Sequence, residues 1–258
     1  MDSLPKVLAC AGAGLAGGVL SGLFGIGGGI VMVPLLGLAV GLDQHRAQGL
    51  TLAGMLLPNG LPAVLHYRRR GVPVHWKLVG GMLLGFLPGV VAGAWTANRI
   101  PEPPLRWGFA LFLVLVAVQT LRAGRRPGPA PEASARREAT AGFALLAGLA
   151  GGLSAGLLGI GGGLVIIPLL AWLCRMPQQE AQVQSLVLLL LPLGLPGVVV
   201  YAAAQGGLPW GLLAATAGGF MLGAYLGARA GTTLRGPTLQ RGFALMLVLA
   251  AALLLRKG

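Results

Sequence analysis

Three long stretches of the chain contain no aspartate, glutamate, lysine or arginine. They cover residues 7–42, 139–174 and 181–228. About 20 apolar residues are enough for a helix to cross a bilayer. Only 10% of the 258 residues are charged, whereas a soluble domain has about 25%. The sequence therefore predicts an all-α polytopic membrane protein, with residues 1–258 forming a single transmembrane domain.

The basic residues indicate topology. Nineteen Lys and Arg against six Asp and Glu give a net charge of +13, which in a soluble protein would suggest nucleic acid. Here they fall in loops and at segment ends, so we expect contact with membrane lipid and no nucleic-acid partner. Five arginines lie between residues 122 and 138, and the positive-inside rule makes residues 123–138 a cytoplasmic linker.

The chain contains an internal repeat. Residues 15–36 match residues 149–170 with 15 identities in 22 positions, at an offset of 134. The same offset, without a gap, pairs Gln48 with Gln182 and Tyr67 with Tyr201. We therefore expect two homologous repeats, 1–122 and 139–258, of about four to five helical segments each.

Two topologies are consistent with this division. Residues 47–67, 74–97 and 105–121 are each long enough to span, but about 13 residues at 30–42 make only about 20 Å of helix. If residues 7–42 form one kinked helix, the two repeats are parallel; if they form a hairpin, the second repeat is inverted. Loop charges do not decide between these models. We favour inverted repeats with Gly-rich discontinuous helices, because a cluster of four glycines in five residues is a poor helix former.

A Gly-Ile-Gly-Gly-Gly motif occurs in both repeats, at 25–29 and 159–163. Glycine leaves the backbone N–H groups uncovered, and a helix that starts there presents unpaired donors and a partial positive charge. This combination suits an anion within the membrane; the alternative is close helix packing. The candidate substrate-binding glycines are Gly25, Gly27, Gly28, Gly29, Gly159, Gly161, Gly162 and Gly163.

Other glycines recur every four residues, as in Gly81, Gly85, Gly89 and Gly93. Similar rows run through 14–22, 148–156 and 219–227. Small residues at this spacing form a stripe on one helix face, which lets two backbones approach closely in lipid. We interpret these rows as helix-packing surfaces.

Uncharged polar side chains lie in the apolar segments that follow the glycine motifs. They are expensive in a membrane and suited to orienting an oxyanion, although hydrogen bonds between helices are an equal alternative for each. Asn59 has Leu193 as its counterpart, so any role it has is asymmetric. These candidates for substrate binding are Gln48, Thr51, Asn59, Gln182, Gln184 and Ser185.

No carboxylate lies deep in a segment. Cation carriers usually need acidic or histidine ligands at membrane depth, so an anionic or neutral substrate is favoured. No nucleophile, acid or metal-ligand set converges in the segments. We therefore expect a protein that is not an enzyme and binds no metal or cofactor.

The paired G-x-G-G-G motifs, each followed by an apolar stretch and proline, resemble the sulfite exporter TauE/SafE family. The resemblance covers the chain outside the linker. It implies a prokaryotic inner-membrane carrier of sulfite, organosulfonates or related anions. The family pattern has paired hydroxyls at the start of the next helix, and this chain keeps one in each repeat, Thr51 and Ser185, with Leu50 and Gln184 in place of the others.

The leading hypothesis is a secondary transporter, an exporter, that works by alternating access. The anion would be held at the paired Gly-rich helix N-termini. The alternative is a membrane scaffold or accessory subunit that transports nothing, with its glycines serving assembly. The sequence leaves open whether the protein is a homodimer.

Overall fold

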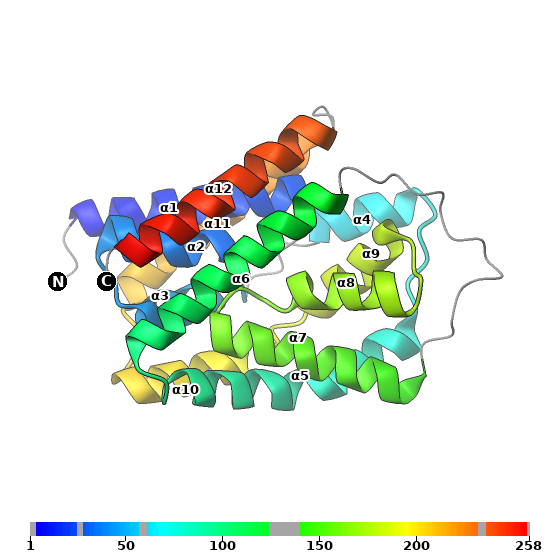
Figure 1. Ribbon diagram of the computed structural model, residues 1–258, viewed down its shortest axis with the longest axis horizontal. Coiled ribbons are helices and arrows are strands. Elements are labelled where there is room, and N and C mark those ends of the chain that lie inside the picture. Colours follow the sequence, from blue (N-terminus) through cyan, green and yellow to red (C-terminus); the bar gives the residue numbers. More distant parts are fainter. Residues whose placement is uncertain (1–3, 25–27, 57–60, 124–139, 232–235, 257–258) are drawn as a thin grey trace.

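The computed structural model describes residues 4–24, 28–56, 61–123, 140–231 and 236–256, and every regular element in these ranges is a helix (Figure 1). In chain order the first half contains α1 (Leu4–Phe24), α2 (Gly29–Leu35), the π-helix η1 (Leu36–Val40), α3 (Gln44–Gly54), α4 (Leu61–Arg69), α5 (Trp76–Ala97) and α6 (Glu102–Ala123). The second half contains α7 (Ala141–Leu158), α8 (Gly163–Leu173), α9 (Gln178–Leu189), α10 (Leu195–Gln205), α11 (Trp210–Gly231) and α12 (Gly236–Arg256).

Four of these helices are long and apolar enough to cross a membrane. They are α1 over Leu4–Gly22, α5, α7 and α11 over Trp210–Gly227. Large apolar side chains on their outer faces are exposed, among them Leu84 of α5 and Leu146 of α7. Such a surface suits contact with lipid, because lipid tails are as apolar as these side chains.

Rows of glycine bring the long helices together in two pairs, α1 with α11 and α5 with α7. A Cβ added to Gly85 of α5 would lie 2.7 Å from the backbone nitrogen of Leu149 in α7, and one on Gly18 of α1 would lie 2.7 Å from that of Ala224 in α11. Backbones this close leave no room for a side chain. These glycines therefore serve close helix packing, as their spacing predicts.

Two short helices double back on the helices that precede them. A Cβ on Gly17 of α1 would lie 3.0 Å from Sδ of Met32 in α2, and one on Gly151 of α7 would lie 2.5 Å from Cδ1 of Ile166 in α8. Pro34 lacks the N–H for a regular helical bond, and α2 continues into η1 directly after it. Together they form the apolar helix Gly29–Val40, which is among the shorter helices of 10–17 residues and cannot span a bilayer alone.

The prediction of one spanning helix over residues 47–67 is wrong. The structure has α3, which ends at Gly54, and a separate α4, which begins at Leu61. Pro62 is the second residue of α4, and proline removes a helical hydrogen bond and disfavours helix in the residue before it. The second half is divided in the same way, into α9 and α10. The described residues therefore contain six α-helices in each half, where four to five segments were expected.

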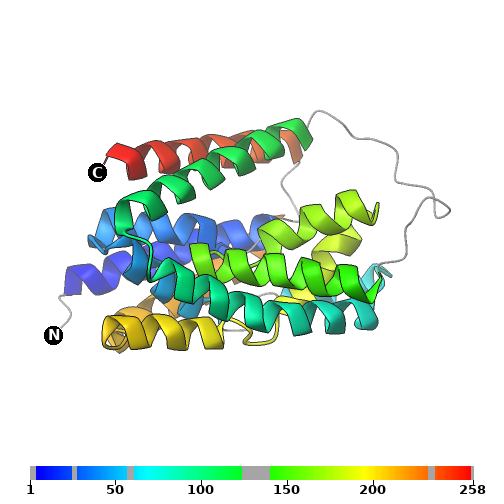
Figure 2. The same ribbon diagram turned by 60° about the horizontal axis from the view of Figure 1, so that its bottom comes forward.

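The start of α1 and the end of α12 lie at the same end of the bundle. In Figure 1, α1 begins and α12 ends at the left, whereas α6 ends and α7 begins at the right. Figure 2 shows α6 and α12 lying side by side along one flank, and these two helices are in contact. The start of the segment predicted to be the linker therefore lies at the opposite end of the bundle from the end of α12.

Candidate functional site

The second glycine motif forms a turn between α7 and α8. Helix α7 ends at Leu158, and Gly159 and Gly161 have φ of +69° and +77°. A Cβ on Gly159 would lie 2.7 Å from Cα of Gln48 in α3. Glycine is required here by both the positive φ and the close approach to α3.

The two glycine motifs meet in space. A Cβ on Gly29, the first residue of α2, would lie 2.7 Å from Cα of Ile160 in the second turn and 2.8 Å from Sδ of Met55. The same Met55 contacts the second motif, because its Cε would lie 3.0 Å from a Cβ on Gly161. We call this meeting point of residues 28–29, 48, 55 and 159–163 the glycine junction. Gly25 and Gly27 lie outside the described residues.

Both short helices begin at the junction without a side-chain cap. Gly28 is the N-cap of α2, Gly162 is the N-cap of α8, and Gly163 begins α8. A Cβ on Gly162 would lie 2.7 Å from the carbonyl oxygen of Gly151, and one on Gly28 would collide with that of Gly17. The same glycines therefore let each short helix fold back closely, and no side-chain cap binds the first backbone N–H groups of either helix.

Three polar side chains follow one face of α3 towards the junction. Gln44, Gln48 and Thr51 are separated by four and three residues, which places them on the same side of the helix. They are 4%, 0% and 0% exposed. The side-chain nitrogens of both glutamines and Oγ1 of Thr51 have no hydrogen-bond partner. We call this row the polar face of α3.

Two tyrosine–glutamine hydrogen bonds connect the two halves of the chain. The Tyr201 hydroxyl lies 2.9 Å from Oε1 of Gln48 and 2.8 Å from the carbonyl oxygen of Gly156, and the Tyr67 hydroxyl donates to Oε1 of Gln182 at 3.0 Å. The first pair is buried and the second partly buried. Both glutamines were candidates, but their tyrosine partners were missed, although the repeat offset of 134 relates one pair to the other, Gln48 to Gln182 and Tyr67 to Tyr201.

The remaining polar candidates have other positions. The Gln184 amide accepts from the His75 backbone nitrogen and donates to the Pro73 carbonyl oxygen, each at 2.9 Å, so it fastens the chain ahead of α5. Ser185 is buried. Asn59 lies outside the described residues. The junction therefore brings together Gln48 and the glycines, with Thr51 one turn further along α3.

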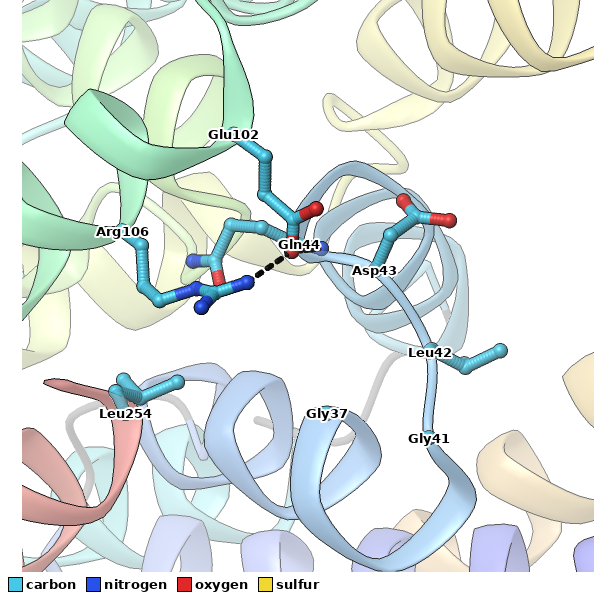
Figure 3. Close-up of a pocket in the computed structure, with 8 residues that line it drawn as sticks. All are labelled: Gly37, Gly41, Leu42, Asp43, Gln44, Glu102, Arg106 and Leu254. Carbon is cyan, nitrogen blue, oxygen red and sulfur yellow. Dashed lines mark hydrogen bonds and ion pairs between the residues drawn. The ribbon is translucent and has the colours of Figure 1, made fainter. Parts of the chain in front are cut away.

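A polar pocket of about 220 Å³ lies at the end of the bundle where α3 and α6 begin (Figure 3). Arg106 Nη2 donates to Oε1 of Glu102 at 2.6 Å, and the backbone nitrogen of Gln44 donates to the same oxygen at 3.1 Å. Burial raises the pKa of the Glu102 carboxyl, but these two hydrogen bonds, with the nearby charges of Arg106 and His45, outweigh it and hold the pKa below its usual value. Glu102 is therefore ionised at neutral pH.

Long apolar helices, lipid-suited outer surfaces and buried polar groups at a junction of broken helices define the class. This is a multi-pass helical membrane protein of the transporter type. The model of the family described as "Sulfite exporter TauE/SafE" matches residues 10–254. The chain belongs to this family, and it is a membrane transporter of the TauE/SafE family.

Individual relatives carry names of the same kind. The chain is 29% identical over 213 residues to the probable membrane transporter protein YdhB of Bacillus subtilis, covering 82% of this chain and 85% of the relative. It is 26% identical over 266 residues to YunE of the same species, covering 95% and 96%. A probable membrane transporter protein of Xylella fastidiosa is 32% identical over 193 residues, covering 72% and 70%.

Proposed function

We propose that this protein is a secondary transporter that exports small sulfur-containing anions, such as sulfite or organosulfonates, across a prokaryotic inner membrane. The anion is bound at the glycine junction, and the two repeats are inverted. The observation that carries the proposal is the pair of buried, unpartnered groups beside the junction, Gln48 Nε2 and Thr51 Oγ1.

Gln48 is oriented so that it offers a donor. Its Oε1 is within hydrogen-bond distance of the Tyr201 hydroxyl, which leaves the two N–H groups of its amide free. A buried polar group without a partner costs about 1–3 kcal/mol. That cost is offset when a ligand supplies the partner, and an N–H donor requires an acceptor such as an oxyanion.

The start of α8 adds to the same electrostatics. This helix has 11 residues, begins at Gly163 and has no side-chain cap. The N-terminus of a helix carries about half a positive charge, and Gly162 and Gly163 add no side chain of their own there. An anion is thereby favoured at membrane depth without a lysine or arginine.

The polar groups at the junction are closed off in this structure, because Gln48 and Thr51 are both 0% exposed. A substrate reaches them only when helices separate. The pairs α1–α11 and α5–α7 are each held by backbones in close contact, so we propose that they act as the two rigid bodies of alternating access.

A flux assay tests this function. Purified protein is reconstituted into liposomes, and the movement of sulfite, thiosulfate, sulfoacetate and taurine is compared with that in protein-free liposomes. We expect protein-dependent flux of at least one of these compounds. The absence of flux for all four, with a stable partner protein that co-purifies, would favour the scaffold alternative.

A further inference from the structure

The pocket beside Glu102 is built from separate parts of the chain. Residues from η1 and the turn after it, from the start of α3, from the first two turns of α6 and from the end of α12 line it. Figure 3 shows the Glu102 and Arg106 side chains pointing towards each other beside Gln44, with Leu254 of α12 across the opening. None of these residues belongs to the glycine junction.

Two donors in this pocket share one acceptor. The Arg106 guanidinium and the backbone nitrogen of Gln44 both converge on one carboxylate oxygen, Oε1 of Glu102. Gln44 Nε2 is a further buried donor, and it has no partner at all. An arginine, a helix N-terminus and an amide nitrogen together make a typical environment for an oxyanion.

The other charged groups nearby leave this character intact. Asp43 also lines the pocket, but its carboxylate accepts from the Arg46 backbone nitrogen at 2.8 Å and lies 3.4 Å from the Arg46 side chain. His45 Nε2 lies 2.9 Å from the Ala97 carbonyl oxygen, outside the pocket lining. A cation ligand is disfavoured because the unpartnered group, Gln44 Nε2, is a donor.

The pocket and the proposed transport site share one helix, α3. Gln44 at the pocket, Gln48 at the glycine junction and Thr51 share the polar face of α3, and each has an unpartnered buried atom. In the second repeat, Gly236 corresponds to Glu102 and Gln240 corresponds to Arg106. The pocket therefore has its charged pair only on the first-repeat side.

We propose that this pocket binds a small oxyanion through the Arg106 guanidinium, the Gln44 side-chain amide and the first N–H of α3, and that the Glu102 carboxylate occupies the site in this structure. A free anion must displace Glu102 to bind. The site deepens the proposed function as the vestibule at the end of the bundle opposite the end of α6, but binding there is measurable without transport.

Binding is measured by isothermal titration of sulfite into the full-length protein, purified in a non-ionic detergent. Glu102→Gln keeps an oxygen for Arg106 but removes the competing charge, so we expect sulfite to bind about tenfold more tightly or better. Arg106→Gln is expected to weaken binding about tenfold or more. The exposed Arg69→Gln is the matched control, with binding as in the wild type.

Gln44→Met separates binding from folding. Because it removes a buried donor without a partner, we expect this variant to be at least as heat-stable as the wild type and to bind sulfite more weakly. Unchanged affinity in both Glu102→Gln and Gln44→Met would overturn the proposal. If Glu102→Gln tightens sulfite binding but the wild-type protein transports none of the four compounds in the flux assay, the vestibule site stands and the proposed function fails.

The oxyanion has two sources, a soluble anion or the phosphate of a lipid. Titrations in nanodiscs of phosphatidylcholine alone and with phosphatidylglycerol distinguish them. For a soluble ligand, sulfite affinity is the same in both membranes. For a lipid ligand, phosphatidylglycerol lowers the apparent sulfite affinity of the wild type, and Arg106→Gln removes this competition. The soluble-ligand result and the lipid-ligand result each support an oxyanion site.

Discussion

Thr51 and Thr216 are two fully buried threonines that differ in one respect. Both are 0% exposed. Oγ1 of Thr51 has no hydrogen-bond partner, whereas Oγ1 of Thr216 donates to the Leu212 carbonyl oxygen at 2.7 Å. Replacing each by valine keeps the shape of the side chain and removes only the hydroxyl, so the pair isolates the effect of an unsatisfied polar group.

The expected changes in the free energy of unfolding have opposite signs. Burying a hydroxyl without a partner costs about 1–3 kcal/mol, so we expect Thr51→Val to stabilise the protein by about 1 kcal/mol. Thr216→Val loses a bond within its own helix, which we expect to contribute no more than the average of about 0.6 kcal/mol for polar bonds between helices in membranes. Helix propensities of Thr and Val are similar, so the two variants should differ by about 1–2 kcal/mol.

The assay is equilibrium unfolding in mixed detergent micelles, followed by the helical signal in circular dichroism. Wild type, Thr51→Val and Thr216→Val are compared at the same protein and detergent concentrations. A loss of stability of about 1 kcal/mol or more in Thr51→Val would show that its hydroxyl has a partner. The argument that Thr51 is held ready for a ligand would then be refuted.

Three further predictions concern packing and topology. Tyr201→Phe should cost about 1–2 kcal/mol of unfolding free energy, and Tyr67→Phe less, because only the first bond is fully buried; equal losses would contradict this. Gly85→Ala should destabilise by about 1–3 kcal/mol because its methyl group meets α7, whereas Gly80→Ala, with nothing within 4 Å, should stabilise by about 0.5–1 kcal/mol; the same sign in both variants would refute the packing account. Compartment-sensitive reporters inserted after Ala123 and fused after residue 258 should report opposite sides of the membrane, and the same side for both would exclude inverted repeats.

The sequence predicted the long helices well because their signal is simple. Apolar runs located α5 and α6 within about three residues. It failed at residues 47–67, where apolar composition continues through a break between α3 and α4. Hydropathy does not register lost hydrogen bonds, and the prolines at 58 and 62 were the signal that deserved more weight.

The candidate site was predicted in outline. The glycine motifs, Gln48 and Thr51 stand out because glycine clusters and polar groups are unusual in apolar segments. Gln44 was missed because it comes before the apolar run, although its spacing from Gln48 places it on the same helix face. The Glu102–Arg106 pair depends on contacts between α6, α3 and α12 that no local pattern encodes.

The initial rate of sulfite flux in proteoliposomes tests the central claim most directly. The double variant Gln48→Met with Thr51→Val removes both unpartnered groups beside the glycine junction, and Thr216→Val serves as the buried control. Hydrogen bonds to a charged ligand contribute about 1.5–3 kcal/mol each, so the account predicts a rate at least about tenfold lower in the double variant and near wild type in the control. A wild-type rate in a correctly folded double variant would contradict the account.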